Sequence, residues 1–145
     1  MPEAFESVYY VLGRDFTNAG RVSTQIKDTL KRLGINPSVV RRVAIVSYEA
    51  EMNLVMYATR GKILLNVSSE AVTIRIDDEG PGIHDVSLAM QEGWSTATPE
   101  MREMGFGAGM GLPNIRRNAD KFDISSEMGR GTRLFVQINQ ADAKI

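Results

Sequence analysis

The segment from about residue 38 to residue 59 restricts the fold more than any other part of the chain. Its apolar positions recur at helical spacing and Gly61 follows its end, so we expect one long helix. Glu49 and Asn53 lie about 40° apart around that helix, inside its apolar stripe. Burying such groups without partners costs roughly 1 to 3 kcal/mol each, which predicts a ligand site. A solvated face, or bonds to neighbouring backbone, would explain the pair equally well.

The rest of the sequence predicts short strands and two further helices. We expect strands at residues 5–16, 62–67, 71–77, 122–126 and 132–138, and helices at 21–33 and 113–121. The second and third of these strands are separated by residues 68–70, which is hairpin spacing. A chain of 145 residues is long enough for one ordinary hydrophobic core, so we expect a single domain over residues 1–145.

Composition excludes several classes of function. The net charge of -1 comes with interspersed signs, so nucleic acid is not an expected partner. The chain has no cysteine, which excludes disulfides and thiolate metal sites and is compatible with a reducing cytosol. No apolar run is long enough to span a bilayer, and the first ten residues carry acids where a signal peptide would carry positive charge. We therefore expect a cytoplasmic protein without a membrane partner.

An aspartate follows the strand at residues 71–77 on the side of its apolar positions. By this alternation Asp78 faces the core, and Gly80 and Gly82 leave the next backbone open to a ligand. A buried carboxylate beside open backbone suits an exocyclic amine, although a simple tight turn has the same composition. Thr132 faces inward on the last strand, where its hydroxyl could share the ligand of Asp78 or simply fill a strand position.

A glycine-rich stretch without convincing periodicity covers residues 79–110. A loop of this length inside a compact domain usually has a function, such as covering a ligand. It ends in alternating glycines ahead of a predicted helix, where backbone amides can bind a triphosphate, although glycine runs are also typical of flexible linkers. No Lys-Ser or Lys-Thr pair follows the last glycine, so this is not a P-loop. The candidate phosphate-binding residues are Gly107, Gly109, Met110, Gly111 and Leu112.

Four motifs occur in a fixed order along the chain. They are Glu49-x-x-x-Asn53, Asp78-x-Gly80-x-Gly82, Gly107-x-Gly109-x-Gly111-Leu112 and Gly129-x-Gly131-Thr132. This set resembles the nucleotide-binding superfamily of DNA gyrase, the heat-shock chaperone ATPase, sensor histidine kinases and mismatch-repair ATPases. The short length, the absence of a phosphoacceptor helix, and the stretches SYEAEMNLVMYA and GAGMGLPNIRRNADKF are similar to the anti-sigma regulatory serine/threonine protein kinases. The similarity covers roughly residues 7 to 138.

This resemblance implies an α+β fold and an ATP site. The fold would be a two-layer α/β sandwich of the Bergerat type, with a mixed, mostly antiparallel sheet packed on helices and an ATP lid. Asn53 would coordinate Mg²⁺ through its side-chain oxygen. Asp78 would accept from the adenine amine with support from Thr132, and the glycine loop would wrap the phosphates. Glu49 would act as general base on a serine hydroxyl or on water.

The resemblance leaves three functions open. The first is a serine kinase that phosphorylates an anti-sigma factor antagonist-like protein. The second is a non-catalytic ATP-gated switch that holds such a protein or a sigma factor. The third is an isolated histidine-kinase catalytic domain, which is disfavoured because the only histidine, His84, lies in the lid. Family members can form homodimers, and Arg102 is the nearest candidate for the arginine that some members place before the phosphate-loop glycines.

Overall fold

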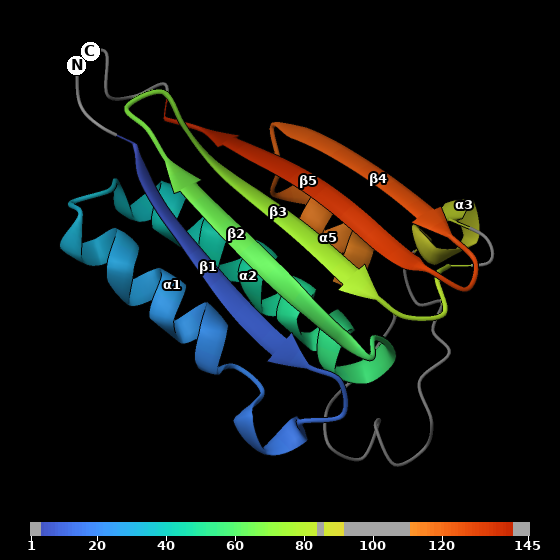
Figure 1. Ribbon diagram of the computed structural model, residues 1–145. Coiled ribbons are helices and arrows are strands. Elements are labelled where there is room, and N and C mark those ends of the chain that lie inside the picture. The colour runs from blue at the N-terminus through green and yellow to red at the C-terminus, as the bar shows by residue number, and fades with distance from the viewer. Residues whose placement is uncertain (1–3, 84–85, 92–110, 141–145) are drawn as a thin grey trace.

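The computed structural model describes residues 4–83, 86–91 and 111–140. Five strands form one sheet in the order β1-β2-β3-β5-β4 (Figure 1). The strands are β1 (Phe5–Leu12), β2 (Arg60–Val67), β3 (Ala71–Glu79), β4 (Lys121–Glu127) and β5 (Gly131–Asn139). Every neighbouring pair is antiparallel, because β2–β3 and β4–β5 are hairpins and the other connections return the chain in the opposite sense. The described sheet is therefore antiparallel throughout, where the sequence predicted a mixed, mostly antiparallel one.

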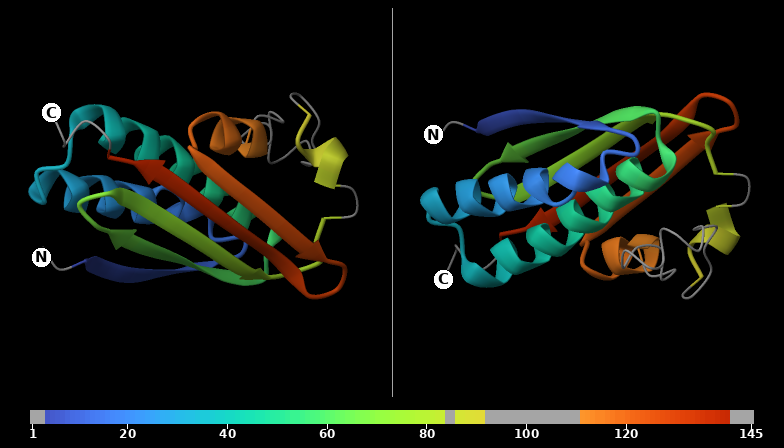
Figure 2. Two further views of the ribbon diagram at one scale, coloured as in Figure 1. Left: turned by 90° about the horizontal axis from the view of Figure 1, so that it is seen from above. Right: turned by 90° about the horizontal axis from the view of Figure 1, so that it is seen from below.

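The main helices cover one face of this sheet and leave the other open (Figure 2). The helices are η1 (Phe16–Asn18), α1 (Arg21–Arg32), α2 (Pro37–Tyr57), α3 (Val86–Ala89) and α5 (Gly111–Arg117). The α2 helix begins where the Asn36 side chain accepts a hydrogen bond from the Ser38 amide at 2.9 Å. This arrangement confirms the predicted two-layer α+β sandwich. No helix in the described ranges is long and apolar enough to cross a membrane.

The core lies between the sheet and α2. Alternate residues of β3 and β5 point toward the helices and are buried, as Ile74 and Val136 are. Val43, Val46 and Leu54 supply the facing stripe of α2. Burying one such aliphatic side chain stabilises the fold by about 1.5–3 kcal/mol. The predicted alternation along β3 was correct, because Val72, Ile74 and Ile76 are buried. Asp78 continues this alternation and therefore lies on the side of the sheet that faces the helices.

Two predicted boundaries were too long. The strand predicted to reach residue 16 ends at Leu12, because Arg14 takes a left-handed conformation with φ of 66°. The Arg14 amide then donates to the Val55 carbonyl at 2.7 Å, so the chain leaves the sheet for α2. The helix predicted to reach residue 121 ends at Arg117, where the Asn118 side chain donates to the Asn114 carbonyl at 2.8 Å.

A buried acid fastens α1 to α2. Glu51 is 2% exposed, and its carboxylate accepts from the amides of Gly20, Val22 and Ser23 at 3.0, 3.2 and 2.9 Å. A carboxylate at a helix N-terminus satisfies amides that have no partner within the helix and interacts favourably with the helix dipole. Sequence reasoning did not single out Glu51, although an acid in the middle of a core helix was the available signal.

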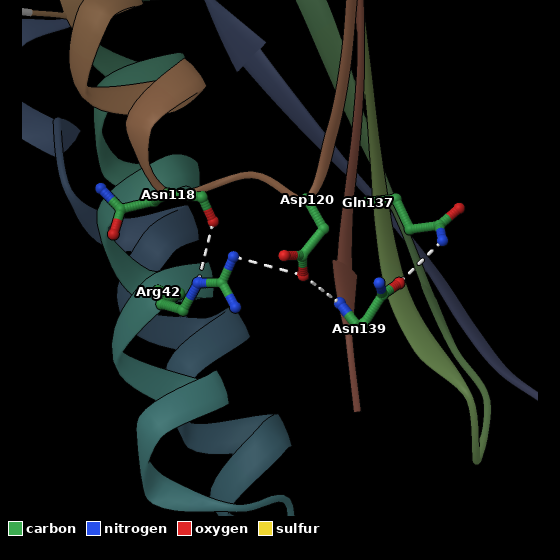
Figure 3. Close-up of polar contacts among 5 residues, drawn as sticks. All are labelled: Arg42, Asn118, Asp120, Gln137 and Asn139. Atoms are coloured by element: carbon green, nitrogen blue, oxygen red, sulfur yellow. Dashed lines mark hydrogen bonds and ion pairs between the residues drawn. The ribbon is translucent and has the colours of Figure 1, made fainter. Parts of the chain in front are cut away.

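Arg42 of α2 holds the far end of α5 (Figure 3). Its Nε donates to the Asn118 carbonyl at 3.0 Å, and its guanidinium forms an ion pair with Asp120 Oδ2 at 3.3 Å. The same Asp120 oxygen accepts from the Asn139 amide at 2.7 Å. These contacts join α2 to the chain that follows α5 and to the end of β5.

Candidate functional site

The first turn of α5 lies against Glu49 and Asn53 of α2. Glu49 Oε2 accepts a hydrogen bond from Asn114 Nδ2 at 3.0 Å. Gly111, the first residue of α5, is so close to Asn53 that a Cβ built on it would lie 3.2 Å from Asn53 Oδ1. The structure thus brings together Glu49, Asn53 and Gly111 as the sequence predicted. Asn114, which the sequence analysis did not single out, joins them.

The Asn53 amide is available to a ligand. The side chain is half-buried, and no hydrogen bond to its amide is formed within the described residues. An amide oxygen is a hard ligand of the kind that Mg²⁺ prefers. Among the residues that the structure describes, no three His, Cys, Asp or Glu side chains gather into a metal site. The side-chain oxygen of Asn53 has the chemistry of a magnesium ligand, and its assignment to that ion stays a prediction.

Asp78 lies at the end of β3, on the same face as the buried β3 residues. Its Oδ1 accepts from the Thr132 backbone amide at 3.0 Å, which leaves Oδ2 for another donor. Burial raises the pKa of this carboxyl above its ordinary value; the Thr132 amide lowers the pKa and the neighbouring Asp77 raises it further. Such a partly desolvated carboxylate gains from a ligand donor, as an exocyclic amine would provide.

Gly131 allows β5 to approach Asp78. A Cβ on Gly131 would lie 2.0 Å from the Asp78 carbonyl oxygen and 2.8 Å from its Oδ1. No side chain can occupy that position without moving one of the two strands. The glycine that precedes Thr132 in the predicted motif is therefore required for the Asp78–Thr132 hydrogen bond.

The Thr132 hydroxyl has a different partner from the one that sequence reasoning considered. Thr132 is 9% exposed, and its Oγ1 lies 2.9 Å from Ser126 Oγ. Ser126 Oγ also accepts from the Ile83 amide at 2.7 Å. The contact of Thr132 with Asp78 is made by its backbone, so support of a ligand through the hydroxyl stays a prediction. Ser126 gave no signal in the sequence beyond an inward strand position.

The turn after Asp78 is held against the β4–β5 turn. The Gly80 amide donates to the Arg130 carbonyl at 3.1 Å, and the Gly129 amide donates to the Pro81 carbonyl at 3.0 Å. Gly82 has φ of 79°, and a Cβ there would lie 2.6 Å from the Glu127 carbonyl oxygen. Gly80 and Gly82 thus have a packing role, and their predicted contact with a ligand stays a prediction.

The C-terminal end of α2 connects the two halves of the site. A Cβ on Gly80 would lie 3.3 Å from the carbonyl oxygen of Tyr57, one turn beyond Asn53. A Cβ on Gly61 would touch Asp78 on one side and Leu54 on the other. The Asp78 turn therefore packs on the same end of α2 that carries Asn53.

Part of the predicted phosphate loop lies outside the described residues. Gly107, Gly109 and Met110 fall there, as do His84 and Arg102. Of the remaining two, Gly111 touches Asn53 as described, and Leu112 is buried in the core. The Leu112 side chain packs on the protein, so its predicted contact with a nucleotide would have to come from its backbone.

The antiparallel sheet under one layer of helices, with Glu49 and Asn53 one turn apart on the central helix, has the architecture expected of a nucleotide-binding ATPase domain. The family model described as "Histidine kinase-, DNA gyrase B-, and HSP90-like ATPase" matches residues 38–142. The chain therefore belongs to this ATPase family and, by its relatives, to the anti-sigma regulatory kinases within it.

Three curated relatives show this similarity. The serine/threonine-protein kinase RsbT of Bacillus subtilis (strain 168) is 30% identical over 112 residues, which are 74% of this chain and 78% of that protein. The anti-sigma F factor of Thermoanaerobacter sp. (strain X514) is 33% identical over 89 residues, 58% of this chain and 59% of that protein. The anti-sigma F factor of Caldanaerobacter subterraneus subsp. tengcongensis is 34% identical over the same length, with the same coverage.

Proposed function

We propose that this protein is an ATP-dependent serine protein kinase that regulates a small partner protein in the cytoplasm. The observation that carries the proposal is the arrangement of Glu49 and Asn53 against the first turn of α5, next to the Asp78 turn. A base and a hard metal ligand from α2, and an amine acceptor from the end of β3, are thereby brought to one site. The similarity to a protein named as a serine/threonine-protein kinase supports the same reaction.

ATP fits the site as the phosphoryl donor. Asp78 presents a partly buried carboxylate with Oδ2 available to the adenine amine, and the glycines at 80 and 131 let the neighbouring backbone pack closely around Asp78. Asn53 would hold Mg²⁺, which when bound neutralises charge on the phosphates. Gly111 continues the glycine loop that we propose wraps these phosphates.

Glu49 is proposed as the general base. The serine oxygen of the partner attacks the γ-phosphorus, its proton passes to the Glu49 carboxylate, and ADP leaves with the electrons of the broken P–O bond. A positioned base of this kind contributes typically about 10²–10⁴-fold in rate. The hydrogen bond from Asn114 orients the Glu49 carboxylate, and the carboxylate itself accepts the proton.

The acceptor is proposed to be an anti-sigma factor antagonist-like protein, with a sigma factor as an alternative or additional partner. Two of the relatives described above are named as anti-sigma F factors. Their names favour a second function, in which ATP occupancy controls which protein is held and phosphoryl transfer is secondary or absent. A homodimer is compatible with both functions.

Glu49→Gln separates the two functions. Glutamine preserves size and can still accept from Asn114, but it is not basic, so a kinase should retain ATP binding and lose roughly 100-fold or more in transfer. The test uses radiolabelled ATP with a purified antagonist domain from the same organism, mapping of the phosphorylated residue, and titration calorimetry of ATP with and without Mg²⁺. Exposed Glu79→Gln is the matched control. Transfer to serine at the parent rate by Glu49→Gln would remove Glu49 as the base.

A further inference from the structure

A groove of about 790 Å³ lies between α1 and α2. Its apolar lining comes from Ile35, Pro37, Val40, Ala44, Ile45 and Tyr48. Tyr48 is 47% exposed, although it is among the largest side chains of α2. The groove therefore offers apolar surface that the described fold leaves accessible.

This apolar surface is a second stripe on α2. The core-facing residues of the helix, such as Val43, Val46 and Ala50, pack against the sheet. Residues 37, 41, 44, 45 and 48 are related by helical spacings of three and four, so they share a face of α2 away from the core-facing residues, with the buried Val40 at its edge. A helix with apolar residues on more than one face is typically buried on more than one side, and α1 covers this face only in part.

The rim of the groove is basic. Lys27 and Lys31 lie one turn apart on α1, and Arg41 lies across from them on α2; all three are exposed. None of the three forms an ion pair within the described part of the chain. Three cations without counterions beside apolar surface match a partner that carries carboxylates around apolar side chains.

The groove leads to the proposed catalytic base. Among the described residues that line it, Glu49 is the one acid. It lies four residues beyond Ile45 on the same helix face, and its Oε2 is bound by Asn114 of α5. A protein segment seated in the groove would therefore lie beside the carboxylate that is proposed to accept the serine proton.

We propose that the α1–α2 groove is the docking site for the acceptor protein, filled by a segment of that protein with apolar side chains flanked by Asp or Glu. The inference rests on the proposed kinase function and adds the surface and the charge of its substrate. Docking of this kind contributes to recognition of the acceptor and not to binding of ATP. It predicts that charges on the rim determine the KM for the acceptor but not its kcat.

The first experiment measures binding directly, in the full chain without nucleotide. The probe is a fluorescent amphipathic peptide with leucines on one face and glutamates beside them; a matched peptide carries lysines in place of the glutamates. The acidic peptide should bind at least ~10-fold more tightly than the basic one, and raised salt should weaken it. Lys27→Glu with Lys31→Glu should abolish that preference, and Tyr48→Ala should weaken binding of the acidic peptide. Equal binding of both peptides, or no effect of the double variant, would overturn the proposal.

The control places the same charge change on the open face of the sheet. Lys62→Glu with Lys121→Glu alters the net charge identically but should leave peptide binding unchanged, and melting temperatures establish that both double variants are folded. Sedimentation tests whether a second copy of this chain occupies the groove instead. If the parent is a dimer that dissociates in the Lys27/Lys31 variant, and that variant still binds the peptide, the proposal is overturned. A wild-type protein that binds the acidic peptide but no ATP would instead refute the kinase function and leave the groove intact.

The second experiment connects the groove to catalysis. With the purified antagonist domain as acceptor, the Lys27/Lys31 variant should raise the KM for that protein ~10-fold or more while kcat and the Kd for ATP stay at parent values. A loss confined to kcat, or an unchanged KM, would contradict docking in this groove.

Discussion

Glu49 of α2 and Asn114 of α5 are joined by a 3.0 Å hydrogen bond in which the Asn114 amide donates to carboxylate oxygen Oε2, across 65 residues of sequence. The bond fixes the orientation of the proposed base. Asn114 is in turn held by Arg117, whose guanidinium donates to Asn114 Oδ1 at 3.0 Å. The base is therefore positioned by the helix that immediately follows the glycine-rich segment.

Replacing Asn114 tests this positioning role. Asn114→Ala removes the donor, so we expect kcat to fall by about tenfold because the carboxylate loses its fixed orientation, while the Kd for ATP changes little. Asn114→Asp places a second carboxylate against Glu49, and its loss in kcat should be larger because like charges repel. Steady-state kinetics at saturating ATP, with melting temperatures for both variants, provide the measurement. Equal kcat values in the parent and the alanine variant would show that the bond is only structural.

Asp78→Asn should remove the preference for ATP over GTP. The asparagine can still accept from the Thr132 amide through Oδ1, so the fold is kept, but its amide group cannot replace the charged acceptor of the adenine amine. We expect ATP binding to weaken at least ~10-fold while GTP binding changes much less. Competition between the two nucleotides, measured at constant Mg²⁺, gives the ratio directly. An unchanged ratio would exclude Asp78 from base recognition.

The same substitution has a pH signature in the nucleotide-free protein. Burial raises the pKa of Asp78 in the folded state above its ordinary value of 3.8, so the folded state binds more protons than the unfolded state between those two values. This group therefore favours folding most at low pH, and that contribution is lost as pH rises through the folded pKa. The melting temperature of Asp78→Asn minus that of the parent should be most positive near neutral pH and should shrink toward pH 4. A difference that is constant across the range would contradict the shift.

The residues that sequence reasoning found and missed differ in one physical respect. Glu49, Asn53 and Asp78 stood out because a polar group interrupts a local apolar pattern, which a period of 3.6 or 2 residues makes visible. Asn114 and Ser126 act through hydrogen bonds to residues 65 and 43 positions away, and no local pattern reports such contacts. The β2–β3 hairpin was predictable from local spacing, whereas the placing of β5 between β3 and β4 joins strands far apart in the sequence and has no local signal.

Gly111→Ala should affect nucleotide binding without lowering the stability of the fold. In a helix, alanine is favoured over glycine by up to about 1 kcal/mol, so the melting temperature should hold or rise. Its Cβ, however, would lie 3.2 Å from Asn53 Oδ1 and should displace the proposed metal ligand, weakening Mg-ATP by about tenfold. A double-mutant cycle with Asn53→Ala distinguishes the cause, because the two losses should not add if Gly111→Ala acts through Asn53. Additive losses would place the effect elsewhere.

The Arg42–Asp120 contact predicts how the fold responds to acid. The Asn139 amide and then the Arg42 guanidinium hold the pKa of Asp120 below its ordinary value, so its stabilisation is present above about pH 4 and is lost as pH falls through the folded pKa. Asp120→Asn keeps an acceptor for Asn139 but removes the charge, which should cost about 1 kcal/mol at neutral pH after allowance for solvent screening. Urea unfolding at pH 7 and at pH 3 should show this difference at the first pH and a smaller one at the second. The stabilisation that comes from the Arg42 ion pair should also fall with added salt, whereas the stabilisation from the Asn139 hydrogen bond should not. A stability difference between parent and variant that changes with neither pH nor salt would contradict the contact as described.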